Sequence, residues 1–148
     1  MNYNKIIFLD IDGVIAVSKD SDAEKELFLA GIYYPFNQEC VDILNTIIVE
    51  TGADIILSSD WRISLSLDKL NEIFTINNVI KSPKDITPIG MEHRGLEIKS
   101  FIQQHFINQF VILDDMDIEG FNNNFIKVNP DTGLTIKLLP KIIQKLKC

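Results

Sequence analysis

Short apolar runs alternate with longer segments of helical periodicity along this chain of 148 residues. Three of the runs, Lys5–Asp10, Asp54–Ser58 and Phe110–Asp114, have continuously apolar centres, as strands covered on both faces do. Phe125–Val128, which contains one lysine, is predicted to form another strand. We predict a further short strand at Asn78–Lys81. Together the runs predict a parallel sheet of about five strands.

Segments with apolar residues every three or four positions separate the strands and predict helices. These segments are residues 37–50, a stretch marked by Leu67, Leu70, Ile73 and Phe74, residues 95–105 and residues 135–147. Gly52 is expected to end the first helix, and Pro140 to bend the last helix or delay its start. Residues 82–90, with two prolines and a glycine, are predicted to form a loop. The alternation predicts one α/β domain over residues 1–148 with helices on both faces of the sheet.

The composition, 46% hydrophobic and 24% charged, fits a single globular domain. The apolar runs are far shorter than the roughly 20 residues that span a bilayer. The N-terminus lacks signal-peptide features, so we expect a cytoplasmic protein with no membrane partner. Cys40 and Cys148 have no metal-binding spacing and are expected to be free thiols. The net charge of −7 disfavours non-specific binding to nucleic acid, although residues 81–148 hold 9 bases and 8 acids.

Three of the predicted strands end in groups that handle phosphate or metal. Asp10, Asp12 and Gly13 follow the first strand, Ser58 and Ser59 the second, and Asp114 and Asp115 the strand that begins at Phe110. Ligands of open parallel sheets bind beyond the carboxyl ends of the strands, so we expect these groups to converge. Carboxylates that converge repel one another unless a hard cation lies between them, and Mg²⁺ prefers oxygen ligands. The sequence therefore predicts a magnesium site.

This arrangement suits phosphoryl transfer. A carboxylate beside the cation can attack phosphorus, while a second carboxylic acid protonates the leaving oxygen and then deprotonates a water. A serine hydroxyl and a cationic side chain can hold the transferring oxygens.

These segments resemble the motifs of the haloacid dehalogenase (HAD) superfamily. FLDIDGV at 8–14 resembles the first motif, IILSSDWR at 55–62 the second and VILDD at 111–115 the fourth. The third motif is a Lys or Arg near the start of the helix before the acidic strand. Arg94 and Lys99 both qualify, and we expect Arg94. The resemblance implies a Rossmann-like domain and, because the second acid Asp12 is present, a phosphatase.

The resemblance also implies roles for individual residues. The catalytic residues would be Asp10 as nucleophile, Asp12 as general acid and base, Ser58 as donor to the phosphoryl group and Arg94 as cation. Phosphate-binding groups are expected at Ile11, Gly13, Ser58, Ser59, Arg94 and Lys99. Mg²⁺ would be held by Asp10, the backbone carbonyl of Asp12, Asp114 and, directly or through water, Asp115.

A narrower likeness concerns SSDWR, RGLEI, VILDD and DTGLT (131–135), which together resemble a small HAD family also found in multi-domain RNA-repair proteins. It implies a phosphorylated nucleic-acid end or a nucleotide as substrate, with small metabolites and phosphoproteins as alternatives. Residues 14–36 have room for a flap but not for a folded cap, and residues 60–94 are largely used by a helix. We therefore expect a capless enzyme with an open site and no obligate protein partner.

Two other kinds of protein remain open alternatives. A receiver-like signalling domain also carries an acidic cluster and a phosphoaccepting Asp, but its acidic pair closes the first strand. The second alternative is a catalytically silent binding module with the same fold. Among the remaining residues, Trp61 is expected to anchor the core, and Lys137, Lys141 and Lys145 to form a solvated helix face.

Overall fold

The computed structural model describes residues 3–17 and 35–147, so most of the predicted 14–36 flap lies outside the described residues. The strands are β1 (Lys5–Leu9), β2 (Asp54–Leu57), β3 (Asp85–Ile86), β4 (Gln109–Asp114) and β5 (Phe125–Lys127). The helices are α2 (Gln38–Thr51), α3 (Trp61–Ser64), α4 (Leu67–Ile76), α5 (Arg94–His105) and α6 (Leu139–Lys147), with a 3₁₀ turn η1 (Ile136–Leu138) before α6. All strand pairs are parallel, which confirms the predicted sheet.

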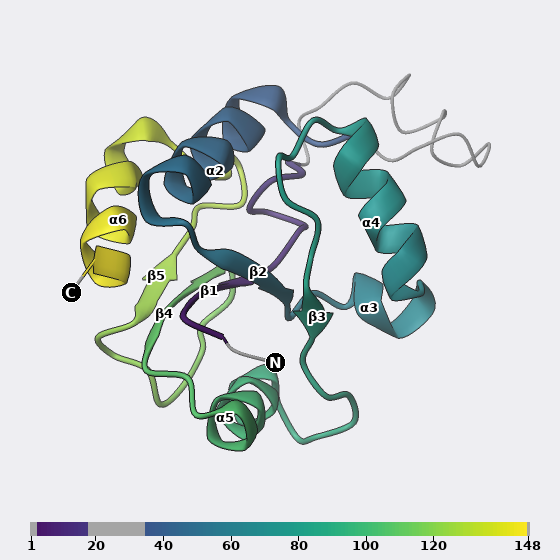
Figure 1. Ribbon diagram of the computed structural model, residues 1–148, viewed down its shortest axis with the longest axis vertical. Coiled ribbons are helices and arrows are strands. Elements are labelled where there is room, and N and C mark those ends of the chain that lie inside the picture. The colour runs from purple at the N-terminus through teal and green to yellow at the C-terminus, as the bar shows by residue number, and fades with distance from the viewer. Residues whose placement is uncertain (1–2, 18–34, 148) are drawn as a thin grey trace.

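The strand order is β3-β2-β1-β4-β5 (Figure 1). The chain builds outward from β1 through β2 to β3, and then crosses back to place β4 on the other side of β1. The order therefore reverses between β1 and β4, and such a switch point is where parallel sheets bind ligands. Receiver domains have the order 2-1-3-4-5, so this topology excludes the receiver-like alternative.

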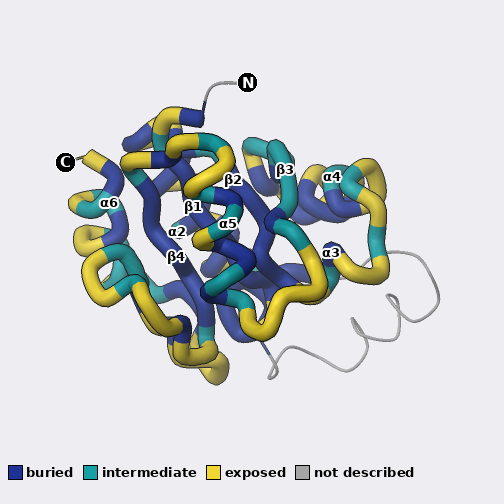
Figure 2. Tube along the Cα trace, turned by 90° about the horizontal axis from the view of Figure 1, so that it is seen from below, coloured by how far each residue is buried: buried dark blue, intermediate teal, exposed yellow. Residues whose placement is uncertain are grey.

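Helices cover both faces of the sheet, as predicted (Figure 1). Strand residues alternate between two apolar clusters because successive side chains point to opposite faces. Ile7 and Leu9 of β1 face a cluster that includes α2, α4 and α6, whereas Ile6 and Phe8 face α5. Figure 2 shows the central strands buried along most of their length and the exposed residues on the outer helices and loops. The central strands β1, β2 and β4 are thus covered on both faces, while the edge strands β3 and β5 are partly exposed.

The strand predicted at Asn78–Lys81 is wrong, and the edge strand is β3 inside the predicted loop. Asn78 has a φ of 69°, in the left-handed region, and belongs to the turn that ends α4. The pairing partner of β2 comes later, where Lys84 and Thr87 donate from their amides to the carbonyls of Ile55 and Leu57. Only two residues pair there, between Pro83 and Pro88. So short a strand leaves no apolar run in the sequence by which it could be predicted.

The predicted helix ends are confirmed. Gly52 closes α2 at a φ of 73°, and α6 begins only at Leu139 after η1, with Pro140 in its first turn. Residues 60–94 form α3, α4 and β3. β3 extends the sheet next to β2, and α4 packs on the face of the sheet that α2 and α6 also cover. Within the described residues, no helix combines the length and apolar character that crossing a membrane requires.

Candidate active site

The carboxyl ends of β1, β2 and β4 meet at the switch point and bring three predicted site residues together. The amide of Asp10 donates to the carbonyl of Leu113 over 3.0 Å, and the amide of Ser58 donates to the carbonyl of Leu9 over 3.1 Å. Asp10 therefore lies between Ser58 on one side and Asp114 on the other. The predicted convergence of the strand ends is present in the structure.

A tight turn follows β1. The carbonyl of Ile11 accepts from the amides of residues 14, 15 and 16, and Gly13 adopts a φ of 81°. A Cβ atom at Gly13 would lie 2.6 Å from Oδ2 of Asp115, so only glycine lets that carboxylate approach. The amide of Ile11 donates to Oδ1 of Asp10, and the amide of Gly13 donates to Ala16. The backbone amides of Ile11 and Gly13, two of the residues predicted to bind phosphate, thus both donate to other groups of the protein.

Three carboxylates form the centre of the site. Asp10, Asp114 and Asp115 each offer an oxygen within 4.8 Å of the others. Asp10 is 5% exposed and Asp114 fully buried. Burial, followed by the charge of Asp114, raises the pKa of Asp10 to about 8, against the lowering effect of Arg94. Burial also raises the pKa of Asp114, against the lowering effect of Arg94.

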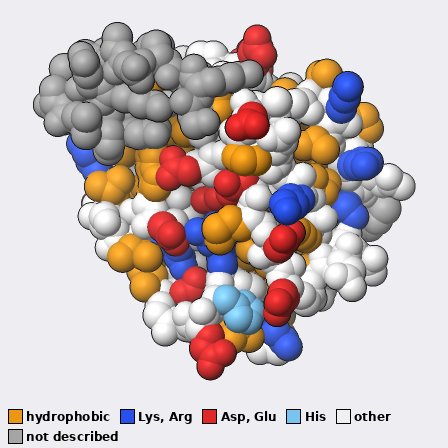
Figure 3. All heavy atoms as spheres, turned by 180° about the vertical axis from the view of Figure 1, so that it is seen from behind, with side chains coloured by type: hydrophobic (Ala, Val, Ile, Leu, Met, Phe, Trp, Pro, Cys, Tyr) orange, Lys and Arg blue, Asp and Glu red, His pale blue; other side chains and the backbone are white. Residues whose placement is uncertain are grey.

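The donor set fits Mg²⁺, because converging carboxylate oxygens are its preferred ligands and their mutual repulsion calls for a cation. The cluster contains three of the four predicted metal-binding residues. The fourth, Asp12, was assigned through its backbone carbonyl, and its carboxylate lies outside the cluster. In Figure 3, acidic side chains are spread through the centre of the face seen from behind, with basic ones between them.

Arg94 reaches these carboxylates from the first turn of α5. Its Nη1 donates to Oδ2 of Asp114 over 2.7 Å and lies 3.4 Å from Oδ2 of Asp10, and its Nη2 donates to Asp60. Burial lowers the pKa of Arg94, but Asp114 and Asp10 outweigh it and keep the pKa raised, so the side chain stays cationic. Lys99 is exposed and lines a separate pocket between α5 and residues 119–121. Of the two candidates for the third motif, the structure places Arg94 in the site.

The two serines after β2 differ in their surroundings. The side chain of Ser58 is fully buried, and among the described residues its Oγ has no hydrogen-bond partner. A buried hydroxyl without a partner costs free energy, so it is expected to bind a ligand or a water. The Oγ of Ser59 instead accepts from the amide of Trp61 at the start of α3. Ser58 is therefore the serine available to a substrate.

Trp61 has a role that the sequence did not indicate. Its Nε1 donates to Oδ2 of Asp12 over 2.9 Å, and its ring lies 5.9 Å from that of Phe36 between centroids. Asp12 is exposed, and the indole fixes its carboxylate beside the site. The position of Trp61, three residues after Ser58 in the second motif, was the available signal.

Arg62 holds together the loops that carry the site, a role that the sequence did not predict. It is buried, and its guanidinium donates to the backbone carbonyls of residues 58, 59, 87 and 88 and to Glu97 over 2.8 Å. These contacts tie the loop after β2 to the loop after β3 and to α5, which carries Arg94. A charged group satisfied on so many sides holds a fixed geometry.

The strand order and the grouping of these side chains at the switch point define a class, a Rossmann-like α/β domain of the HAD superfamily. Within it, the chain belongs to the family described as the HAD domain in Swiss Army Knife RNA repair proteins, which matches residues 6–138. Membership implies phosphatase-type hydrolase chemistry, and HAD domains generally use Mg²⁺. No curated protein and no solved structure matches the chain.

Proposed function

We propose that this protein is a Mg²⁺-dependent phosphomonoesterase that transfers the phosphoryl group of its substrate to Asp10 and then to water. One observation carries the proposal. Arg94 lies against Asp10 and Asp114, next to the carboxylate of Asp115, at the point where the strand order reverses.

In the first half-reaction an oxygen of Asp10 attacks phosphorus and the bond from phosphorus to the leaving oxygen breaks. The Asp12 carboxylic acid gives its proton to that leaving oxygen. Arg94 and the Oγ of Ser58 hold the equatorial oxygens, which gain charge in the transition state. The product is an aspartyl-phosphate on Asp10 and a free alcohol.

In the second half-reaction the Asp12 carboxylate takes a proton from water, whose oxygen attacks the phosphorus. The bond between phosphorus and Asp10 breaks, and inorganic phosphate leaves with Asp10 restored as a carboxylate. Trp61 keeps the exposed Asp12 carboxylate oriented for both proton transfers.

Asp10, Asp114 and Asp115, together with the Asp12 carbonyl, would hold Mg²⁺. When bound, the ion supplies positive charge that neutralises the carboxylates and the phosphoryl oxygens. The raised pKa of Asp10 supports this assignment, because a nucleophile needs its carboxylate ionised near neutral pH and burial alone opposes that.

The substrate that we propose is a phosphorylated nucleic-acid end or nucleotide. The family description names RNA repair proteins, and between residues 60 and 94 the chain adds to the core layers instead of building a cap. Small metabolites and phosphoproteins are the alternative substrates, and a catalytically silent binding module is the alternative to an enzyme.

The test compares kcat/KM for 3′- and 5′-phosphorylated oligonucleotides, mononucleotides, phosphopeptides, sugar phosphates and an aryl phosphate, with Mg²⁺ and with EDTA. Asp10→Asn is the inactivating variant, and Asp68→Asn, an exposed acid on α4, is its matched control. We expect activity that requires Mg²⁺, survives in the control and is highest on nucleic-acid ends. No turnover of any phosphate would favour the silent module, and a preference for sugar phosphates would reject the substrate.

A further inference from the structure

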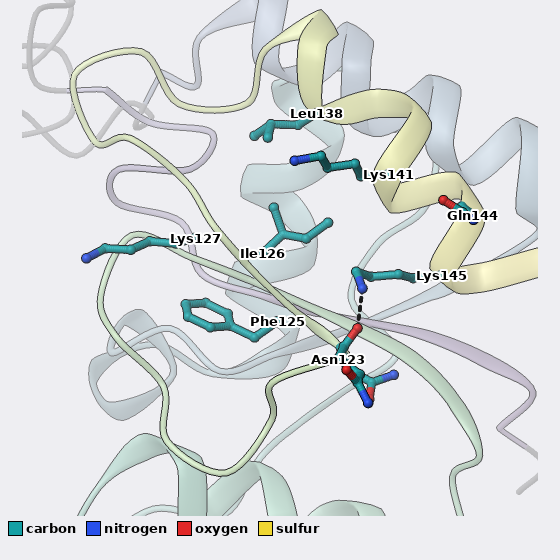
Figure 4. Close-up of a pocket in the computed structure, with 9 residues that line it drawn as sticks. Asn123, Phe125, Ile126, Lys127, Leu138, Lys141, Gln144 and Lys145 are labelled. Carbon is teal, nitrogen blue, oxygen red and sulfur yellow. Dashed lines mark hydrogen bonds between the residues drawn. The ribbon is translucent and has the colours of Figure 1, made fainter.

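A groove lies between the edge strand β5 and helix α6, outside the site described above. It has a volume of about 690 Å³ and is lined from both elements by Lys127, Lys141, Lys145 and Phe125 and by the Asn123–Asn124 turn. Figure 4 shows Lys127 and Lys141 extending toward the same side, and Lys145 directed at the carbonyl of Asn123, to which it donates.

The groove is basic on an otherwise acidic protein. Among the described residues that line it there are three lysines and no acid. Residues 121–148 contain five lysines and one aspartate, although the whole chain has a net charge of −7. Lys127 pairs with Asp117 over 2.9 Å, but both side chains are more than half exposed, and such pairs break at little cost. The lysines of α6 thus converge with one from β5, which a merely solvated helix face does not require.

The groove begins beside the catalytic centre. Lys127 is the register partner of Asp114, so its strand position is one strand away, roughly 4.8 Å. From there β5 runs back to Phe125, a rise of about 7 Å at the usual spacing along a strand, and the Asn123–Asn124 turn lies beyond it. A chain whose phosphorylated end lies at Asp10 would therefore meet Lys127 before it reaches the turn.

We propose that this groove binds the single strand of a nucleic acid behind its terminal phosphate. This inference rests on the proposed function and specifies how its substrate is held. Lysines match the phosphodiester charges, and the half-buried ring of Phe125 offers a surface on which a base can stack. The Nδ2 of Asn124 donates to the carbonyl of Phe110, so Asn123 supplies the side-chain amide that can bond base edges. An acidic peptide shares the charge of such a strand but has no bases to use the ring and the amide.

The test uses the full chain and binding of an unphosphorylated single-stranded RNA of about ten nucleotides, within the usual site size, which does not depend on catalysis. The variant K127Q/K141Q removes two groove charges. Its control, K137Q/K147Q, removes the same charge from η1 and α6 outside the groove. Equal unfolding midpoints of the two variants and of the wild type establish that the fold is kept.

We expect K127Q/K141Q to weaken RNA binding roughly tenfold at about 0.1 M salt and to lower the slope of log affinity against log salt by about 1.4, and the control to change neither. Hydrolysis of an aryl phosphate should be unchanged. Equal losses of RNA binding in both variants, or no RNA binding by the wild type, would reject the groove as the RNA-binding site. If the wild type still hydrolyses an aryl phosphate, that result leaves the proposed function unaffected. An acidic peptide of the same charge that binds as tightly would reject nucleic acid as the occupant. RNA binding by a protein that hydrolyses no phosphate would instead refute the proposed function alone.

Discussion

Asp12 differs from the three clustered carboxylates because it is exposed and bound to an indole. A general acid at an exposed position has many orientations open to it, and the hydrogen bond from Trp61 selects one of them. Restricting the proton donor to one geometry is worth part of the 10²- to 10⁴-fold effect that general acid catalysis contributes, on the order of tenfold for orientation alone.

Trp61→Phe should therefore lower kcat about tenfold with little change in KM, because it keeps a ring beside Phe36 and removes only the N–H donor. The loss should be larger for a nucleotide, whose leaving oxygen needs the proton, than for an aryl phosphate. Phe36→Leu is the control, since it leaves the indole donor in place. Identical losses on both substrates would argue against a role in proton transfer.

Arg94→Met should reduce kcat/KM by about 10²- to 10³-fold, because the charge that stabilises the phosphoryl oxygens is lost. Arg94→Lys should keep part of the activity, since it retains a cation without the paired donors. Lys99→Met should stay within about twofold of wild type, as expected for an exposed side chain. A severe loss in Lys99→Met with an active Arg94→Met would reverse the assignment of the third motif.

At the scale of elements, the turn that follows β1 lies close to the acidic loop after β4 and to the turn at residues 131–135, and a glycine makes each of these two approaches possible. Gly13 and Gly133 both have positive φ, and a Cβ atom at either would lie under 3 Å from a neighbour. At Gly133 the neighbours are Cys40 and the carbonyl of Val14, and that carbonyl also accepts from the amide of Leu134. The 131–135 turn therefore packs against the turn that carries Asp12. The turn residues of the narrower family likeness thus have a packing role.

Gly13→Ala should destabilise the fold by more than Gly52→Ala and also reduce activity. Both positions have a similar left-handed φ, 81° and 73°, but an added Cβ meets the Asp115 carboxylate in the first and open space in the second. Gly52→Ala should cost about 1 kcal/mol from backbone strain alone and leave kcat unchanged. Urea unfolding and kcat measured side by side provide the check, and equal behaviour of the two variants would contradict the close approach.

The strands with apolar centres could be predicted from sequence because burial on both faces leaves a pattern that local composition reveals. Asp10, Ser58 and Asp114 could be placed together because they follow such strands. β3 could not, since two paired residues between prolines carry no pattern. The contacts of Trp61 with Asp12 and of Arg62 with Thr87, Pro88 and Glu97 could not be predicted either, because they join residues 25 to 49 positions apart and depend on side-chain direction.

At the scale of the whole molecule, the carboxylate cluster links stability to pH and to metal. The folded-state pKa of Asp10 lies at about 8, above the ordinary 3.8, so the metal-free folded protein holds a proton that the unfolded chain releases. The resulting stabilisation is complete below about pH 4 and is lost as the pH rises through about 8. Asp114, whose pKa is raised by burial, acts in the same direction.

Metal-free wild type should therefore lose stability relative to Asp10→Asn between about pH 6 and about pH 8, since asparagine does not ionise. Mg²⁺ should stabilise the wild type more at the higher pH, because fewer protons compete for the carboxylates. Urea unfolding of both proteins with EDTA and with Mg²⁺ measures this. A difference between the two proteins that does not vary with pH would contradict the buried, protonated Asp10.

The central claim is that the phosphoryl group passes through Asp10, and trapping that group tests it most directly. The measurement is an acid quench of a single turnover with labelled phosphate ester, followed by peptide mapping of the labelled protein. With an aryl phosphate, whose leaving oxygen does not need the proton from Asp12, Asp12→Asn should accumulate more label than wild type, because the water that releases the phosphate lacks its base. We predict label on the peptide that contains Asp10, and none in Asp10→Asn. Product formation without label at Asp10, or label on another residue, would contradict the mechanism.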